Sequence, residues 1–492
     1  MDPQPSSVSS AEAVLAASSD SEFLRYWLSA VLCFAIFAAS VPVIPSADMW
    51  WHLGTGRYIL QNRAVPHADP FSFTAAGKPW IAHEWLSDVI LYGVYSLAAS
   101  AGLQLLAGAV IGLAFWLAYC VSGGSTLARI LALGLGIWTA HPIFSVRPQI
   151  FTFLLASVFL LVLHRYNSRE QARELALLPI STIFWVNLHG GYLLGPVLIL
   201  LSTVGNLLDA LFGLQDASIT KRRIGLLLLT LLACVAVVPL NPNGLAMYSY
   251  PFATLHSAQM QVGIMEWLSP DFHLPIFYPL AGLLFLTVAV LALSPSRPKP
   301  SDLLLFVFFG LATLRSMRNL PFFVLVAFPL LATYLRSPSW KWPALPPPIQ
   351  RILKITAVVL AAALSALSVS DHFGLELQIE KERFPQRAAA FLKEKQLPAP
   401  LFNSYDFGGY LIWKLYPQYR VYIDGRADLY GDAFLGDFIE VYQVNADPAP
   451  ALDRAGIRTV ILEPRSVLAA YLRNQKNWTR VYEDPVAVIF TR

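Results

Sequence analysis

The residues in this sequence that are best suited to chemistry lie close together, between positions 46 and 85. This stretch combines carboxylates, imidazoles, cations and indoles: Asp48, Asp69, Glu84, His52, His83, Arg57, Lys78, Trp50, Trp51 and Trp80. Carboxylates and imidazoles can transfer protons, and cations can bind phosphate. The apolar run at 23–45 is long enough to cross a bilayer core of about 30 Å, so Asp48 is expected at the membrane surface. An aromatic belt would explain the tryptophans but not the charged side chains.

A second set of polar residues recurs where later apolar runs end. Its members are Asn187 and His189, Asn241 and Asn243, Arg315 and Arg318, His141 and Arg147, and Glu266 with Asp271. Arginines at the outer ends of spans run against the positive-inside tendency and usually have an anionic partner. The segments 187–191 and 241–244 could also simply cap helix ends. If these groups share one cavity with Asp48 and Glu84, they suit an enzyme acting on a lipid-linked anionic substrate.

The composition indicates a polytopic α-helical membrane protein. Of the 492 residues, 56% are hydrophobic and only 13% are charged, and the mean hydropathy is +0.54. About twelve apolar runs are candidate spans, at 23–45, 86–100, 103–121, 126–141, 149–164, 174–188, 192–213, 223–240, 276–293, 302–316, 320–336 and 352–370. The formal charge of +4 is spread over short loops, which argues against a nucleic-acid partner. The cysteines all lie in apolar runs and form no disulfide framework.

Basic residues predict the orientation of the spans. Lys and Arg cluster in four loops, at 165–173, 221–223, 297–299 and 336–354, and successive clusters are separated by two spans. Such loops stay on the cytoplasmic side, so we expect a cytoplasmic amino terminus and an outer location for the segment after Ser370.

The same rule limits the number of crossings early in the chain. Between the outer loops 46–85 and 141–149 an even number of spans is required, yet three apolar segments occupy 86–141. One of them, such as 86–100 or 126–141, must be interfacial, re-entrant or merged with a neighbour. About 11 transmembrane helices are therefore expected.

Near residue 371 charges become frequent and apolar runs shorten. FPQRAAAFLKEKQL and SVLAAYLRNQKN predict helices, and PLFNSY, YRVYID, IRTVILE, WTRVYE and VAVIFTR predict strands. We expect a disordered cytoplasmic segment at 1–22, a transmembrane domain at 23–370 with its first outer loop at 46–85, and an outer-side α/β domain at 371–492. The sequence around Asp406, Asp424, Arg426 and Asp428 suits either saccharide binding or ordinary turns, including a Phe-Gly-Gly turn.

The layout of residues 24–370 resembles a known superfamily. A first span is followed by D-x-W-W-H-L, Gly-Arg-Tyr, VPHADPFSFT, G-K-P-W and H-E-W. This order resembles the first outer loop of the GT-C membrane glycosyltransferases, in the branch of the protein O-mannosyltransferases, the lipid A aminoarabinose transferase and the RgtA/B/C/D-like domains. The sequence departs from that pattern at Met49, where relatives have an acidic residue, and in 141–149, where relatives often carry another aspartate. The second departure affects the expected type of acceptor more than the expected type of reaction.

The resemblance implies a cell-envelope enzyme of the cell membrane that transfers a hexosyl or pentosyl group with inversion on the outer face. The donor would be a polyprenyl-phosphate sugar and the acceptor a lipid, glycan or protein. Asp48 would be the catalytic base, with Glu84 as the alternative. The donor phosphate would be held by Arg147, Arg315, Arg318, Lys78 and His83, and the sugar or acceptor by Trp51, His52, Asp69, Asn187 and His189.

Two other classes stay open. A transporter or flippase for a lipid-linked saccharide would share the size and the outer arginines, but its charges would be expected near the bilayer midplane. An assembly protein whose outer domain binds partners is a third possibility. No cofactor is assigned; His52 and His83 could bind a divalent metal, although the loop contains no D-x-D or H-E-x-x-H motif.

Overall fold

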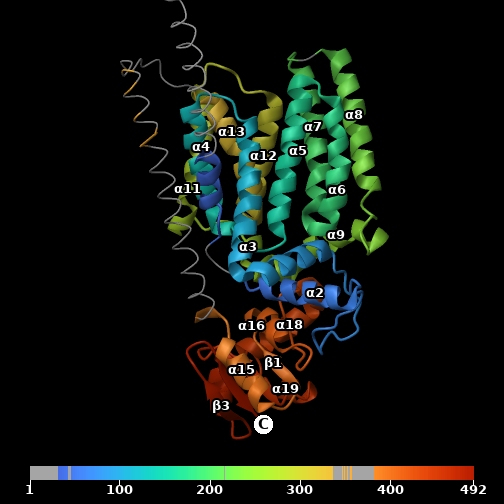
Figure 1. Ribbon diagram of the computed structural model, residues 1–492, viewed down its shortest axis with the longest axis vertical. Helices are drawn as coiled ribbons and strands as arrows, with labels where there is room; N and C mark the ends of the chain where they lie inside the picture. Colours follow the sequence, from blue (N-terminus) through green and yellow to red (C-terminus); the bar gives the residue numbers. More distant parts are fainter. Residues whose placement is uncertain are drawn as a thin grey trace, which may run out of the picture.

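The computed structural model describes residues 31–42, 46–214, 216–335 and 382–492, with the isolated positions 346, 348, 352, 355 and 356. The chain forms a bundle of long helices with a smaller α/β unit at one end (Figure 1). The predictions for 1–22, for most of the run at 352–370 and for the boundary near 371 lie outside the described residues.

The bundle is built from helices whose apolar side chains pack into one core. They are α3 (Trp85–Val121), α4 (Thr126–Ala140), α5 (Gln149–Arg169), α6 (Leu177–Leu188), α7 (Leu194–Leu211), α8 (Ala217–Ala236), α11 (Tyr278–Leu293), α12 (Pro300–Arg315) and α13 (Leu320–Tyr334), and residues 31–39 are also helical. In the part of the chain that the structure describes, six helical segments are long and apolar enough to cross a membrane. The total of about 11 spans stays a prediction.

Short elements connect these helices. They are α9 (Tyr250–His256), α10 (Ala258–Gly263) and the 3-10 helices η1 (His141–Ile143), η2 (Ala172–Ala176), η3 (Gly190–Leu193), η4 (Gly244–Tyr248), η5 (Met265–Trp267), η6 (Pro275–Phe277) and η7 (Met317–Asn319).

Helix α3 breaks near its middle, close to the boundary between the apolar segments 86–100 and 103–121. Ala98 and Ala99 leave the helical conformation, with φ values of −142° and 49°. The part of α3 before the break lies next to α2 (Met49–Asn62), across the end of the bundle (Figure 1). The two helices approach closely, because a Cβ atom on Gly56 would lie 2.1 Å from the Asp88 carbonyl oxygen. Together they form a platform between the bundle and the α/β unit.

The α/β unit has a four-stranded sheet in the order β1-β2-β4-β3, in which β1 is parallel to β2 and the other pairs are antiparallel. Its strands are β1 (Leu401–Asn403), β2 (Thr459–Leu462), β3 (Thr479–Glu483) and β4 (Val488–Thr491), and its helices are α15 (Gln386–Lys395), α16 (Tyr405–Leu415), α17 (Ala427–Tyr430), α18 (Asp432–Gln443), α19 (Ala449–Arg454) and α20 (Val467–Arg473). The predicted helices at α15 and α20 are present, and so are four of the five predicted strands.

Two local predictions in this unit are wrong. The YRVYID segment is not a strand of the sheet, because Val421 exchanges backbone hydrogen bonds of 3.1 Å with Phe71 and Phe73 of the first loop instead. Phe407, Gly408 and Gly409 do not form a turn but lie inside α16. Glycine is needed there for close approach, since a Cβ on Gly408 would lie 2.1 Å from the Ile423 carbonyl oxygen.

The first loop and the α/β unit share a buried ion pair. Arg426 donates to Asp69 and to Asp424, each at 2.7 Å, and its side chain is only 1% exposed. The rings of Trp80 and Phe71 lie against its guanidinium group, with centroids 4.5 and 5.2 Å away. Asp424 and Arg426 therefore hold the two segments together and form no exposed saccharide-binding surface.

Candidate active site

Asp48 lies where the helix bundle meets the α/β unit, paired with an arginine from a different loop. Arg147, between η1 and α5, donates to Asp48 Oδ2 at 3.0 Å and also donates to Glu266 of η5. The side chains of Asp48 and Glu266 are 28% and 27% exposed. One guanidinium group thus bridges two carboxylates that remain open to a ligand.

The platform and the α/β unit fix the position of the Asp48 carboxylate. Asp48 is the N-cap residue of α2, and Trp51 Nε1 donates to its Oδ1 at 3.4 Å. On the other side lies Gly425, where an added Cβ would come within 2.1 Å of Asp48 Oδ1. Gly409 of α16 also packs closely, because its Cβ would lie 2.8 Å from the Ala47 carbonyl oxygen. The α/β unit therefore forms one wall of the site.

A second guanidinium group, that of Arg318 in η7, stands near the same carboxylate. It lies over the ring of Trp267, 4.9 Å from the centroid, and its electrostatic neighbours include Arg147, Glu84 and Asp48. No carboxylate of the described residues lies within salt-bridge distance of Arg318. A half-buried cation without an ionic partner is suited to an anionic ligand.

Glu84 lies in a different environment, at the N-terminus of α3, where three imidazole rings surround it. His83 Nε2 lies 3.2 Å and His189 Nε2 3.5 Å from Glu84 Oε1, and His52 Nε2 lies 3.8 Å from Oε2. His52 Nδ1 also contacts Asp88 Oδ1 at 2.6 Å. The carboxylate is only 12% exposed.

The hydrogen bonds of His189 define which ring nitrogen carries its proton. Nδ1 accepts from the Gly191 backbone N–H at 3.0 Å and lies 2.7 Å from Thr152 Oγ1, which itself accepts from Trp185 Nε1 at 2.8 Å. The Thr152 hydroxyl therefore donates to Nδ1, and Nε2 carries the proton toward Glu84. Burial lowers the pKa of His189 to about 3, which keeps the ring neutral.

Glu84 and His83 form the charged pair of this cluster. Burial alone would raise the pKa of Glu84, but the nearby imidazoles, His83 above all, hold it well below its usual range. Burial would lower the pKa of His83, but the charge of Glu84 outweighs burial and raises it. A carboxylate whose pKa is this low is a poor proton acceptor at neutral pH.

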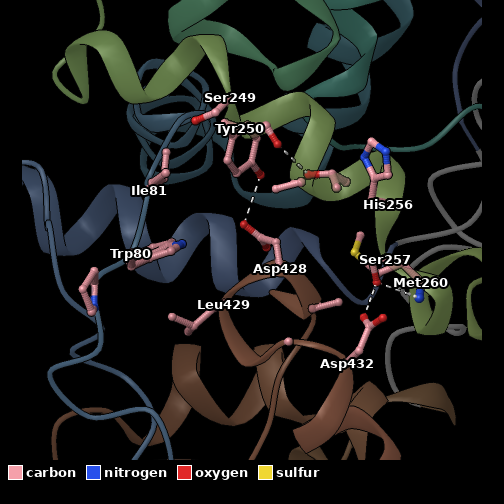
Figure 2. A pocket seen from close by; sticks show the side chains of 15 residues that line it. Trp80, Ile81, Ser249, Tyr250, His256, Ser257, Met260, Asp428, Leu429 and Asp432 are labelled. Carbon is pink, nitrogen blue, oxygen red and sulfur yellow. Dashed lines mark hydrogen bonds between the residues drawn. The ribbon is translucent and has the colours of Figure 1, made fainter.

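A cavity of about 450 Å³ adjoins this cluster, between the first loop, α9, α10 and the α/β unit. Figure 2 shows Tyr250 pointing from α9 toward Asp428, to which its hydroxyl donates at 3.0 Å. The same hydroxyl lies 3.3 Å from His83 Nε2, so it connects the cavity to the Glu84 cluster. Asp432 accepts hydrogen bonds from Ser257 and the Ala258 backbone, which fixes the start of α10 against the α/β unit.

Of the twelve residues that were assigned a catalytic or binding role from the sequence, the structure brings eight together and leaves four outside. Asp48, Trp51, His52, His83, Glu84, Arg147, His189 and Arg318 lie around the Asp48 and Glu84 carboxylates. Asp69 is buried against Arg426, and Asn187 is buried with its amide bonded to Trp85, Ile183 and Leu240. Lys78 and Arg315 are exposed and have no ion-pair partner among the described residues.

Residues beyond these twelve also contribute to the site. Glu266 pairs with Arg147, and Gly425 contacts Asp48, while Tyr250 and Asp428 join the cavity to His83. Glu266 was recognisable as an outer-loop carboxylate, but no sequence signal marks Tyr250 or the role of Gly425. Among the described residues, no group of three or more His, Cys, Asp or Glu side chains is arranged to hold a metal ion.

The fold is that of the GT-C glycosyltransferases. ArnT from Cupriavidus metallidurans superposes with a TM-score of 0.51 at 15% identity, over 96% of this chain and 98% of that one. The oligosaccharyltransferase AglB from Archaeoglobus fulgidus, solved with an inhibitory peptide and a dolichol-phosphate, gives a TM-score of 0.50 at 13% identity over 90% of this chain and 70% of that one. The arabinofuranosyltransferase AftD from Mycobacteria gives 0.51 at 13% identity, over 95% of this chain and 41% of that one. No protein-family model and no curated protein sequence matches the chain.

Proposed function

We propose that this protein is a membrane glycosyltransferase that moves a sugar from a polyprenyl-phosphate donor to an acceptor hydroxyl, with inversion, at the outer membrane face. The observation that carries the proposal is the position of a partly exposed aspartate, Asp48, which is paired with Arg147 and lies near a second guanidinium group, that of Arg318, without an ionic partner among the described residues. The fold supports it, because AglB, a structure of the same fold, was solved with a dolichol-phosphate.

In the proposed reaction Asp48 accepts the proton of the acceptor hydroxyl, and the oxygen of that hydroxyl attacks the anomeric carbon of the donor sugar. The bond from that carbon to the phosphate oxygen breaks, and polyprenyl phosphate leaves with the electron pair. Arg318 and Arg147 stabilise the negative charge that develops on the leaving group.

Glu84 has a different role in this proposal. Its contacts with His83, His189 and His52 hold it as an anion that orders the imidazoles and the start of α3. Asp48, by contrast, is more exposed and has one cationic partner, Arg147. A donor phosphate that takes over the Arg147 contact would release Asp48, so the base would become available only when the donor is bound.

The cavity beside Tyr250 is the proposed acceptor site. It is lined by hydroxyl, carboxylate and indole groups, among them Thr254, Asp428 and Trp80, which suit hydroxyl-bearing molecules (Figure 2). Its contact with the α/β unit through Asp428 would let that unit contribute to acceptor choice.

The deciding experiment supplies polyprenyl-phosphate sugars to the purified protein in lipid and measures release of polyprenyl phosphate. Wild type should release it in an acceptor-dependent way, and Asp48→Asn should lose about 10²- to 10⁴-fold in rate, because it removes a positioned base but keeps the size of the side chain. Asp271→Asn, an exposed carboxylate in the loop between α10 and α11, is the matched control and should behave as wild type.

Three results distinguish the alternatives. Wild-type turnover by Asp48→Asn together with an inactive Glu84→Gln variant would move the base to Glu84. No release from any donor would reject glycosyl transfer. Movement of an intact lipid-linked saccharide across vesicles, without release of the phosphate, would identify a flippase.

A further inference from the structure

A second cavity lies at the opposite end of the helix bundle from Asp48. Its volume is about 730 Å³, and its walls come from α5, α7 and α13, the N-terminal parts of α8 and α12 and the end of α3. In Figure 1 these helices run side by side, with the α/β unit at the other end of the bundle. None of the residues assigned above to glycosyl transfer lines this cavity.

The cavity is apolar inside and polar at its mouth. Leu163, Leu198, Leu325 and Leu330 line the interior and are buried in the helix core. The mouth carries imidazole, amide and charged groups, namely His164, Asn167, Asn206, Asp209, Arg223, Lys299 and Asp302. This division matches a molecule with an apolar chain and a polar head.

Two opposite charges at the mouth lack ionic partners. Lys299 is the N-cap residue of α12 and Asp302 lies in its first turn. In the described part of the chain neither has a salt bridge, and the Asp302 carboxylate accepts only from the Tyr334 hydroxyl, at 3.3 Å. Asp209 is already occupied by the Ser301 backbone N–H and hydroxyl.

An uncharged acceptor stands at the same mouth. The Asn206 amide donates to Asn167 Oδ1 at 3.1 Å and to the Ser202 carbonyl at 2.8 Å, which leaves its oxygen available as an acceptor. Arg223 also lines the cavity but is paired with Glu170 at 3.1 Å. The mouth thus offers Lys299, which has no salt bridge in the described part of the chain, for an anion, and two acceptors for a donor group.

We propose that this cavity binds one phospholipid whose headgroup carries a phosphate and a primary amine. Lys299 contacts the phosphate, Asp302 and the Asn206 amide oxygen accept N–H bonds from the ammonium group, and one acyl chain lies along the leucines. A primary ammonium has three N–H donors, whereas a trimethylammonium group has none and is usually bound by several aromatic rings. A glycerol headgroup would leave Asp302 without a cation. The site is independent of the proposed transferase activity.

Native mass spectrometry of the full chain tests this proposal. The protein is released from vesicles that contain equal amounts of phosphatidylethanolamine, phosphatidylcholine and phosphatidylglycerol, and the retained lipid is identified. Wild type should keep one phosphatidylethanolamine. Asp302→Asn should lower the ratio of phosphatidylethanolamine to phosphatidylcholine roughly tenfold, the effect of losing one charge-assisted hydrogen bond. Lys299→Gln should lower retention of both lipids.

Matched controls come from the same end of the bundle. Arg169→Gln and Arg297→Gln change exposed charges that do not line the cavity, and both should retain lipid as wild type does. Leu330→Phe, which narrows the apolar floor and keeps both charges, should reduce retention even if Asp302→Asn folds poorly. Equal retention of the three lipids by wild type, unchanged selectivity in a folded Asp302→Asn variant, or displacement of the lipid by millimolar soluble phosphoethanolamine would overturn the proposal.

Discussion

Asp48 and Glu84 are two carboxylates of one loop that the fold places in different surroundings. Asp48 is 28% exposed and contacts one arginine, whereas Glu84 is 12% exposed and contacts three imidazoles. Environments that separate two carboxylates in this way commonly give them separate roles. The two environments fit two different roles, in which Asp48 transfers the proton and Glu84 orders the histidines.

At Arg318 we predict an effect on donor use. Arg318→Ala should raise the KM for the polyprenyl-phosphate donor roughly 10- to 100-fold, the range expected for lost charge-assisted hydrogen bonds. Arg318→Lys should restore only part of this, because an ammonium group cannot form the forked contact. Arg315→Ala, an exposed arginine of the same helix end, is the control. Unchanged donor KM in Arg318→Ala would mean that the side chain only reaches toward lipid headgroups.

The pKa of His83 predicts a pH-dependent stability. Its pKa in the folded protein is raised by Glu84 above 6.5, so the ion pair contributes fully below pH 6.5 and is lost as pH rises through the folded value. Because the pKa of Glu84 is depressed, Glu84 loses its negative charge, and with it the ion pair, only at far lower pH. The difference in Tm between wild type and His83→Gln should therefore be larger at pH 6 than at pH 9.

The comparison needs a histidine outside the cluster. His256→Gln changes an exposed side chain that forms no ion pair within the described residues, and its Tm difference should not vary with pH in this way. A His83→Gln difference that stays constant from pH 6 to pH 9 would contradict the assignment of a charged pair.

At the scale of elements, three helices fix the Asp48 site. α2 carries Asp48, Trp51 and His52, the first part of α3 supports it from the bundle side, and α16 with residue 425 supports it from the α/β unit. Each contact depends on a residue without a side chain at the point of closest approach, namely Gly56, Gly409 and Gly425. Small residues therefore determine how near the elements come, and so where the carboxylate lies.

Gly425→Ala should disable the site while leaving the fold intact. The new Cβ would lie 2.1 Å from Asp48 Oδ1 and 2.9 Å from Trp51 Nε1, so the carboxylate must move. A displacement of about 1 Å can cost on the order of 100-fold in rate. Transfer should fall by about that factor, with a change in Tm of only a few degrees. Gly436→Ala in α18, where the nearest atom would be 3.9 Å away, should leave transfer unchanged. Equal activity of the two variants would show that the contact does not position Asp48.

At the scale of the whole molecule, the first loop is the joint between the bundle and the α/β unit. Ala75 of this loop is buried in the core of that unit, and Thr74 Oγ1 donates to the Tyr422 carbonyl. The active-site wall formed by Gly425 depends on this joint, because both segments must keep their relative position. Loss of the joint would thus affect stability and catalysis together.

The Asp69–Arg426 pair should make a large contribution to that joint. Arg426→Met leaves the buried carboxylates of Asp69 and Asp424 without their cation and should cost about 3 to 5 kcal/mol of unfolding free energy. Asp69→Asn should cost less, because Arg426 keeps its ion pair with Asp424. The double variant should cost less than the sum of the two. Arg420→Met, an exposed arginine nearby, should change stability by less than about 0.5 kcal/mol. Strict additivity in denaturant unfolding would rule out a coupled pair.

The orientation in the membrane is a separate prediction. Reporters inserted within 296–300 and after residue 484 should report opposite sides, with the first cytoplasmic, because four basic loops share the face of the first insertion. Reporters on the same side would remove the basis for an outer location of Asp48.

The sequence by itself determined the membrane class, most elements of the α/β unit and the GT-C resemblance, because hydropathy and residue periodicity are local properties. It also pointed to Asp48, Glu84, Arg147 and Arg318, since charged groups at span ends are rare. Only the tertiary structure decided which of them meet. Asp69 pairs with Arg426, 357 residues away, and Val421 joins the first loop and not the sheet. Such contacts depend on how distant segments of the chain pack against each other. Whether a charged side chain has a structural or a catalytic role depends on its burial and on the partner that this packing places beside it.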